Sequence, residues 1–167
     1  MNFRNKIFRI TNSIWLGPFA SPERKSTLTA ASINHILNVG EAPSVLTIDD
    51  GPFRSVVGHS IIDLEPIPEE LAIACIASLH QMLSEAEARV YVHCIAGLNR
   101  SPTVVWLYLV ACGIEPNEAK AIIEKRAPDA IAGHSKLVDA GLVAAIQKFG
   151  SEHFLPHPCP EVLIPAD

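Results

Sequence analysis

The residues with the clearest chemical potential lie together in one short stretch, 93–102, which reads HCIAGLNRSP. The apolar run Val90–His93 predicts a buried strand, and the apolar run that follows the stretch predicts a helix, Ser101–Cys112, with Pro102 in its first turn. A helix N-terminus presents unpaired N–H groups and the positive end of the helix dipole, so it stabilises an anion. The stretch is therefore predicted to be an anion-binding loop between a strand and a helix.

Four side chains of this loop have distinct chemical uses. Cys94 opens it, where the field of the helix and the loop amides favours the thiolate, the nucleophilic form of cysteine. Arg100 closes it with a planar guanidinium that matches two oxygens of a phosphate. Gly97 permits the backbone angles of a tight loop, and Ser101 can donate a hydrogen bond to a departing sulfur. Together they predict a cysteine nucleophile that acts on a bound phosphate.

The other cysteines have a simpler explanation. The four cysteines are widely spaced with no CxxC pair, which predicts free thiols rather than a disulfide framework or a zinc site. Cysteine is among the most buried residue types, so Cys75 and Cys112, on apolar faces of predicted helices, are expected to be packing residues. Cys94 differs because an arginine and a helix N-terminus accompany it.

Composition limits the remaining possibilities. The chain has 167 residues, 49% of them hydrophobic, which predicts one domain over residues 1–150 and a Pro-rich tail over 151–167. A net charge of −5 makes general nucleic-acid binding unexpected. The most apolar run, Val104–Ile114, is far short of the ~20 residues that span a bilayer. With no signal peptide at the start, we expect a cytoplasmic protein without membrane contact.

The elements that must position the loop follow from apolar periodicity. Strands are predicted at Lys6–Ile10, Ser13–Leu16, His35–Val39, Ser55–Ile62 and Val90–His93. Helices are predicted at Ser21–Ala30, Glu69–Ala88, Ser101–Cys112, Pro116–Arg126 and Ser135–Phe149. Alternating strands and helices predict an α/β fold with a mostly parallel sheet of four to five strands flanked by helices. Ligands of such sheets bind at the carboxyl ends of strands, where the loop lies.

The pattern His-Cys, five residues, Arg-Ser after an apolar strand resembles the signature of the cysteine-dependent phosphatases. CIAGLNRS most resembles the small dual-specificity protein phosphatases, and IWLGPFAS, INHILNVG and EPNEAKAIIEKRAP extend the likeness over about residues 7–149. The resemblance implies the protein tyrosine phosphatase-like fold. It also implies an enzyme without a metal or other cofactor, and a phosphorylated protein or peptide as substrate.

The resemblance assigns further roles in the loop and beside it. Backbone amides of five residues are expected to hold the phosphate: Ile95, Ala96, Gly97, Leu98 and Asn99. His93 and Asn38 are expected to support the loop without reacting. The family also uses an aspartic acid some thirty residues upstream as general acid, and Asp63 lies 31 positions before Cys94, with Glu65 as the alternative. The expected reaction is thiolate attack on phosphorus, then hydrolysis of the phosphocysteine.

The sequence leaves several substrate classes open. Phosphotyrosine is the first expectation, with phosphoserine and phosphothreonine as alternatives. Phosphoinositide-directed relatives carry Lys or Arg inside the loop, and this loop has none. RNA 5′-triphosphatases resemble it at Asn99, but the net charge disfavours RNA. A silent phosphate-binding module, sulfur transfer and arsenate reduction are the remaining alternatives. Gly133 and His134 replace an Asn-containing turn of many relatives, so the far wall of the pocket is expected to differ.

Overall fold

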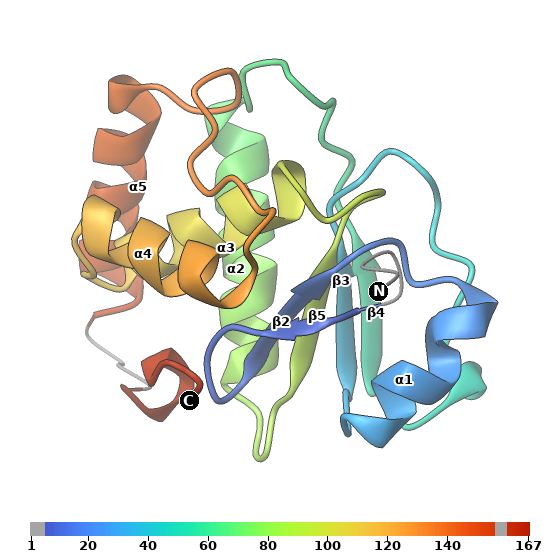
Figure 1. Cartoon of the computed structure of the whole chain (residues 1–167). Coiled ribbons are helices and arrows are strands. Elements are labelled where there is room, and N and C mark those ends of the chain that lie inside the picture. The colour runs from blue at the N-terminus through green and yellow to red at the C-terminus, as the bar shows by residue number, and fades with distance from the viewer. Residues whose placement is uncertain (1–5, 156–159) are drawn as a thin grey trace.

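A five-stranded sheet forms the centre of the molecule (Figure 1). The computed structural model describes residues 6–155 and 160–167. The strand order is β1-β2-β5-β3-β4, in which β1 pairs antiparallel with β2 and the other neighbours pair in parallel. The strands are β1 Phe8–Arg9, β2 Ile14–Gly17, β3 His35–Asn38, β4 Ser55–Gly58 and β5 Val90–His93. The predicted α/β fold with a mostly parallel sheet is confirmed.

Helices cover both faces of the sheet (Figure 1). The α-helices are α1 Lys25–Ala30, α2 Glu69–Leu83, α3 Arg100–Ala111, α4 Pro116–Arg126 and α5 Ala140–His153. The 3₁₀ turns are η2 Pro22–Arg24, η3 Ile48–Asp50 and η4 Pro160–Leu163. Helices α2 to α5 pack on one face of the sheet and α1 on the other. Within the described residues, no helix combines the length and the apolar character needed to cross a membrane.

Alternate residues of β5 enter two separate cores. Val90 and Val92 belong to the large core on the α2–α5 face, whereas Tyr91 packs with Trp15 and Leu28 in the smaller core on the α1 face. Successive side chains of a strand point to opposite faces, and both faces are covered here. All four residues of β5 are therefore buried. This double burial explains the continuous apolar run that predicted the strand.

Helix α3 lies at the centre of the large core. Every residue of α3 is buried, and α2, α4 and α5 all pack against it. The crossing with α5 depends on Gly150, because a Cβ atom there would lie 1.9 Å from the carbonyl oxygen of Ala111. The helix that begins at Arg100 is therefore held on several sides, and its N-terminus is fixed relative to β5.

One predicted helix begins later than expected. The helix predicted at Ser135–Phe149 is α5, which starts at Ala140 because the Asp139 carboxylate caps it by accepting a hydrogen bond from the Leu142 amide at 2.8 Å. Residues 135–139 instead form a turn and an extended step, in which the carbonyl of buried Leu137 accepts a hydrogen bond from the Ile67 amide at 2.9 Å. The apolar periodicity of this segment reflects burial of a turn, not helix.

Other predicted elements are shorter than expected. The helix predicted to reach Ala88 ends at Leu83, and Glu87 has a positive φ of 55°, which turns the chain into β5. The strand predicted at Ser55–Ile62 ends at Gly58, which pairs with Asn38, the last residue of its neighbour β3. The predicted strand Lys6–Ile10 reduces to two residues of β1.

The described part of the C-terminal tail lies against the turn between β1 and β2. Thr11 forms an isolated antiparallel bridge with Pro165, and the Ala166 amide donates to the Ile10 carbonyl at 3.1 Å. Arg126 of α4 also donates from Nε to the Ala166 carbonyl at 2.6 Å. Residues 162–166 are thereby tied to the first strands. Cys159 lies outside the described residues.

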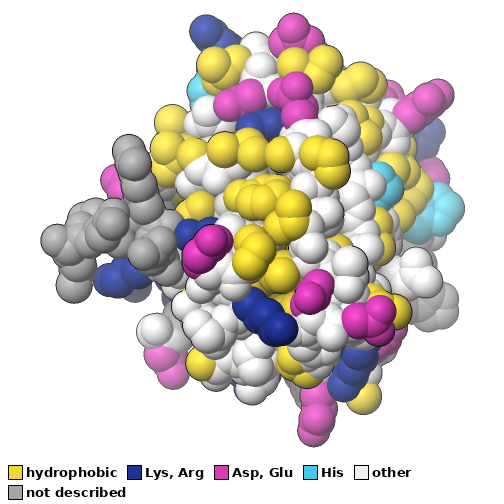
Figure 2. All heavy atoms as spheres, turned by 90° about the vertical axis from the view of Figure 1, so that its right-hand side faces the viewer, with side chains coloured by type: hydrophobic (Ala, Val, Ile, Leu, Met, Phe, Trp, Pro, Cys, Tyr) yellow, Lys and Arg dark blue, Asp and Glu magenta, His cyan; other side chains and the backbone are white. Residues whose placement is uncertain are grey.

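The segment 39–54 between β3 and β4 lies on the right-hand edge of Figure 1, and thus on the face shown in Figure 2. Hydrophobic side chains form a band across this face, with charged side chains around it (Figure 2). Val45 and Ile48 of the segment are 51% and 55% exposed. The acidic residue Glu41 lies near the start of this segment and contacts Arg100.

Candidate active site

The carboxyl ends of three parallel strands meet beside the predicted loop. His93 of β5 pairs with Asn38 of β3 on one side and with Gly17 of β2 on the other. The residues that follow these positions therefore emerge at the same edge of the sheet. Cys94 comes directly after β5, and α3 begins at Arg100, so residues 94–99 form a compact loop between strand and helix N-terminus.

Gly97 lets this loop close. Its φ is +75°, in the left-handed region, and a Cβ atom there would lie 2.6 Å from the backbone carbonyl carbon of Gly17. The loop is further tied by hydrogen bonds of 2.9 Å from the Phe19 amide to the Ile95 carbonyl and of 2.8 Å from the Ile131 amide to the Leu98 carbonyl. Both bonds use loop carbonyls on the outside, which leaves the loop amides available for an anion.

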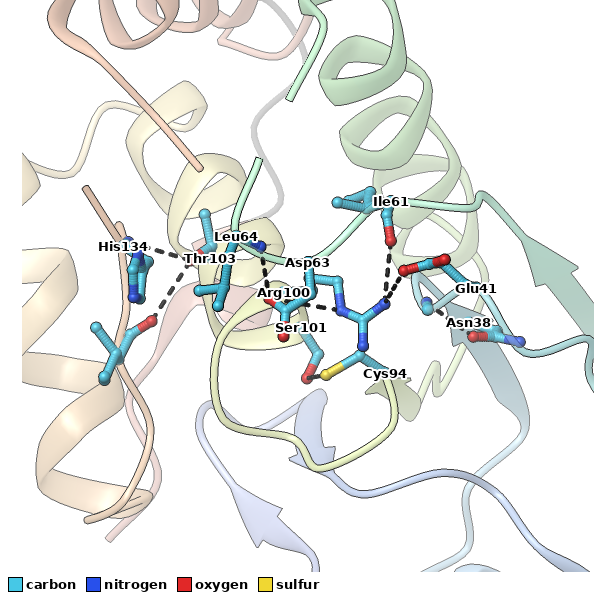
Figure 3. A network of polar contacts seen from close by, with 12 residues as sticks. Asn38, Glu41, Ile61, Asp63, Leu64, Cys94, Arg100, Ser101, Thr103 and His134 are labelled. Carbon is cyan, nitrogen blue, oxygen red and sulfur yellow. Dashed lines mark hydrogen bonds and ion pairs between the residues drawn. The ribbon is translucent and has the colours of Figure 1, made fainter. Parts of the chain in front are cut away.

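The side chains of Cys94 and Ser101 lie in contact. The Cys94 Sγ lies 3.3 Å from the Ser101 Oγ, and the two residues are 2% and 0% exposed (Figure 3). Either atom can donate in the neutral state, but a thiolate only accepts, so Ser101 then donates. The structure therefore brings the predicted nucleophile and the predicted sulfur donor into contact across the helix N-terminus.

Arg100 is held from the side opposite the loop (Figure 3). Its Nη1 donates to the Ile61 carbonyl at 3.0 Å and lies 3.6 Å from the Glu41 carboxylate. Its Nε is buried and has no hydrogen-bond partner among the described residues, although the Asp63 carboxylate lies 3.8 Å away. The guanidinium is therefore held by groups from the segments that follow β3 and β4.

Asp63 reaches the site from the segment after β4. Its side chain is 36% exposed, and its Oδ1 accepts a hydrogen bond from the Leu64 amide at 3.0 Å. Leu64 has a φ of +59°, so the chain turns sharply at this point. Glu65, the alternative acid, is exposed, and it is Asp63 that lies within 4 Å of the Arg100 guanidinium.

His93 supports the loop from beneath. It is fully buried between the rings of Phe19 and Tyr91, and its Nδ1 lies 3.0 Å from the Cys94 carbonyl oxygen. Because a carbonyl only accepts, the hydrogen bond assigns the ring proton to Nδ1. Burial lowers the pKa of His93 to about 4, although the bond to Cys94 acts in the opposite direction. The imidazole is therefore neutral at pH 7.

Asn38 braces a neighbouring segment. Its Oδ1 accepts from the Gly40 amide at 2.9 Å, and its Nδ2 donates to the Ala42 carbonyl at 2.8 Å and to the Ser44 Oγ at 3.1 Å. A Cβ atom at Gly40 would lie 3.2 Å from the Cα of Cys94. The described hydrogen bonds of Asn38 thus shape the segment that packs on Cys94 rather than reaching the loop itself.

Glu41 is a site residue that the sequence reasoning did not single out. Its carboxylate lies beside the guanidinium of Arg100, while its side chain stays 55% exposed. The available signal was its place: it follows the end of β3, and β3 pairs directly with β5. The side chain was missed because its partner, Arg100, lies 59 residues further along the chain.

The far wall of the site is formed by residues 131–134, which contain no asparagine. The Thr103 hydroxyl of α3 donates to the Ile131 carbonyl at 3.4 Å and accepts from the His134 amide at 3.3 Å (Figure 3). Gly133 has a φ of +65° and packs closely against the indole of Trp106. Backbone groups of residues 131–134 therefore anchor this wall to the helix.

The arrangement can bind a tetrahedral oxyanion and attack its central atom. The loop leads from β5 to the N-terminus of α3, where unpaired amides and the positive end of the helix dipole favour an anion; Cys94 opens the loop and buried Arg100 follows it. Among the described residues, no group of three or more His, Cys, Asp or Glu side chains is placed to hold a metal ion. A strand, a cysteine-containing loop and a buried helix that begins with arginine define a cysteine-dependent phosphatase fold.

Comparison with known proteins agrees. Residues 19–142 match the PTP-SAK family, described as "Swiss Army Knife protein, DSP-PTPase phosphatase domain". The chain belongs to this family of dual-specificity-type phosphatase domains. Such membership implies a phosphorylated substrate.

Individual relatives are more distant. Dual specificity protein phosphatase 1B of Arabidopsis thaliana is 27% identical over 143 residues, which cover 84% of this chain and 79% of that protein. The solved structure of DUSP15 has a TM-score of 0.68 at 23% identity and covers 90% of this chain and 92% of its own. PTPMT1 in complex with PI(5)P has a TM-score of 0.65 at 20% identity, over 87% of this chain and 95% of its own. These two structural matches establish the fold.

Proposed function

We propose that this chain hydrolyses phosphomonoesters on proteins through a phosphocysteine intermediate, with phosphotyrosine as the first substrate class and phosphoserine or phosphothreonine as further substrates. One observation carries the proposal. The Cys94 sulfur lies 3.3 Å from the Ser101 hydroxyl in the buried unit that joins β5 to the helix beginning at Arg100.

The first step transfers the phosphoryl group to Cys94. The thiolate sulfur attacks phosphorus, and the bond from phosphorus to the substrate oxygen breaks. Arg100 and the amides of residues 95–99 bind the three non-bridging oxygens as charge develops on them. Asp63, as a carboxylic acid, gives its proton to the departing oxygen, so the substrate leaves as a neutral alcohol or phenol.

The second step releases the phosphate. A water molecule attacks phosphorus while the Asp63 carboxylate takes one of its protons. The bond between phosphorus and sulfur breaks, and the electron pair returns to Cys94 as a thiolate. Ser101 donates its hydrogen bond to this sulfur, which lowers the free energy of the leaving group. Phosphate then dissociates, and the enzyme is restored.

Two features of the site bear on substrate class. The name of dual specificity protein phosphatase 1B supports a protein substrate, whereas the PTPMT1 structure is a complex with PI(5)P. The variable positions of this loop, Ile95, Ala96, Leu98 and Asn99, carry no cation for an additional phosphate. We therefore favour singly phosphorylated protein substrates over phosphoinositides.

The test is hydrolysis of p-nitrophenyl phosphate in EDTA by the wild type, Cys94→Ser and Cys112→Ser. Cys112 is half-buried at the end of α3 and serves as the matched control. We expect activity that survives EDTA, is lost in Cys94→Ser and remains in Cys112→Ser. Activity retained by Cys94→Ser would contradict the mechanism. A folded wild type that binds vanadate without turnover would indicate the silent phosphate-binding module instead.

A further inference from the structure

A cavity of about 510 Å³ adjoins the loop, and neither Asp63 nor Glu41 is among the residues that line it. One wall of the cavity consists of four consecutive loop residues, 95–98. The opposite walls come from Phe8 of β1, Pro18 after β2, and the segment 127–130 after α4. Its volume lies within the range of small-ligand sites, which is roughly 300–1,000 Å³.

The cavity shares the loop residues 95–98 with the proposed phosphate site. The residues 95–98 that line it are those whose amides are proposed to hold the phosphate. Ile95 and Leu98 are 46% and 41% exposed, although they lie beside a buried nucleophile. A group attached to the bound phosphate, or to the residue next to it in a peptide, therefore lies within reach of the cavity.

The lining selects against charge, and above all against negative charge. Its residues are apolar or glycine except for exposed Asp129, and no Lys or Arg contributes to it. An anionic group placed there would lose water without gaining a cation, and it would face a carboxylate. An apolar side chain would instead be removed from water against Phe8, Pro18 and Leu98.

We propose that this cavity is a subsite for an apolar side chain next to phosphotyrosine in a substrate peptide. The inference rests on the proposed function and narrows it. The cavity makes the enzyme select singly phosphorylated, apolar sequences, and it rejects substrates with an acidic residue or a second phosphate beside the reacting one. The lining that produces this selectivity lies mainly outside the loop, in β1 and after α4.

The test compares phosphotyrosine peptides that differ only in the residues flanking phosphotyrosine: leucine, serine or aspartate on both sides. Each peptide is assayed with the wild type, Phe8→Ala and Phe149→Ala. Both phenylalanines are half-buried against the large core, but Phe149 lies on α5, away from the cavity. We expect the wild type to prefer leucine over serine by roughly tenfold or more in kcat/KM, since one apolar group in a pocket discriminates by that order. Phe8→Ala should reduce this ratio to near one, and Phe149→Ala should preserve it.

A second variant does not depend on the folding of Phe8→Ala. Asp129 is exposed, so Asp129→Arg places a cation at the cavity without disturbing the core. It should raise kcat/KM for the aspartate-flanked peptide by about two- to fivefold relative to the leucine-flanked one.

Equal rates for leucine and serine peptides in the wild type, or an unchanged ratio in Phe8→Ala, would overturn the subsite. Faster hydrolysis of a phosphoinositide bisphosphate in micelles than of any peptide would overturn it as well. p-Nitrophenyl phosphate carries no flanking residue, so its hydrolysis reports the proposed function separately. If the folded wild type does not hydrolyse p-nitrophenyl phosphate, both proposals are rejected. If it does, but hydrolyses the three peptides equally well, only the subsite is rejected.

Discussion

Substitution of Ser101 by alanine separates the two proposed steps of the reaction. The Ser101 hydroxyl lies 3.3 Å from the Cys94 sulfur, and no other described hydrogen bond reaches that sulfur. In the first step the thiolate is the reactant, so losing the donor does not slow the attack. In the second step the thiolate is the leaving group, and losing the donor raises the barrier. The variant should therefore accumulate phosphocysteine.

The size of the effect follows from the burial of the pair. Ser101 is fully buried and Cys94 is 2% exposed, so water has little access to replace the hydroxyl. A hydrogen bond to a charged group is worth about 1.5–3 kcal/mol. Since about 1.4 kcal/mol corresponds to a factor of ten, the second step should slow by roughly 10- to 150-fold.

Rapid mixing with p-nitrophenyl phosphate measures both steps. Ser101→Ala should release about one equivalent of p-nitrophenol per enzyme in a burst, followed by a slow steady state. Mass spectrometry of acid-quenched samples should detect the phosphorylated chain. Ser78→Ala is the matched control, because it removes a half-buried serine hydroxyl of α2 that lies 2.8 Å from His59 Nε2, away from the loop residues.

A Ser101→Ala variant with wild-type kcat and no burst would refute this reasoning. It would mean that phosphocysteine hydrolysis needs no donor at the sulfur. A variant with neither a burst nor turnover would place Ser101 in the first step, which the stated mechanism excludes.

Three further predictions concern the surroundings of the loop. Glu41→Gln should lower kcat/KM about two- to fivefold, because the exposed Glu41 carboxylate and the Ile61 carbonyl both contact the Arg100 guanidinium. An increase in kcat/KM would contradict this positioning role of Glu41. Asp49→Asn is the control. The pKa of His93 is about 4 in the folded protein against an ordinary value of 6.5, so the free energy of unfolding decreases as pH falls between these values. From pH 7 to 4.5, urea unfolding should show a decrease in this free energy that is roughly 2–3 kcal/mol larger in the wild type than in His93→Gln. Equal decreases in the two proteins would refute this prediction. Gly150→Ala should destabilise the fold by about 1–3 kcal/mol in thermal unfolding. Gly58→Ala is the control, because a Cβ atom there would meet the Asn38 carbonyl oxygen only at 3.9 Å, and it should leave stability nearly unchanged.

The loop around Cys94 could be predicted from the sequence, because the residues that form it are neighbours along the chain. Cys94, Gly97, Arg100 and Ser101 lie within eight consecutive residues, and a buried strand and a buried helix flank them with unbroken apolar runs. Strand and helix periodicity therefore predicted both the loop and its place at the carboxyl edge of the sheet.

Boundaries were predicted less well, since they depend on contacts outside the segment itself. The helix predicted from Ser135 begins only at Ala140, where Asp139 caps it. The Leu137 carbonyl before it binds the Ile67 amide, a residue that precedes α2. An apolar period alone does not distinguish a helical turn from such a buried irregular segment.

The sequence by itself determined the strand–loop–helix unit around Cys94, the mostly parallel sheet and the family, because these follow from residue types at short spacing. Only the tertiary structure decided which groups contact Arg100. Glu41 follows β3, and Ile61 and Asp63 follow β4, so these contacts join segments that are distant in the sequence. The tertiary structure also decided the cavity beside the loop, whose walls come from β1, β2 and the end of α4. Chain connectivity specifies neighbours along a strand or helix, whereas the packing of helices on the sheet brings distant segments to one edge.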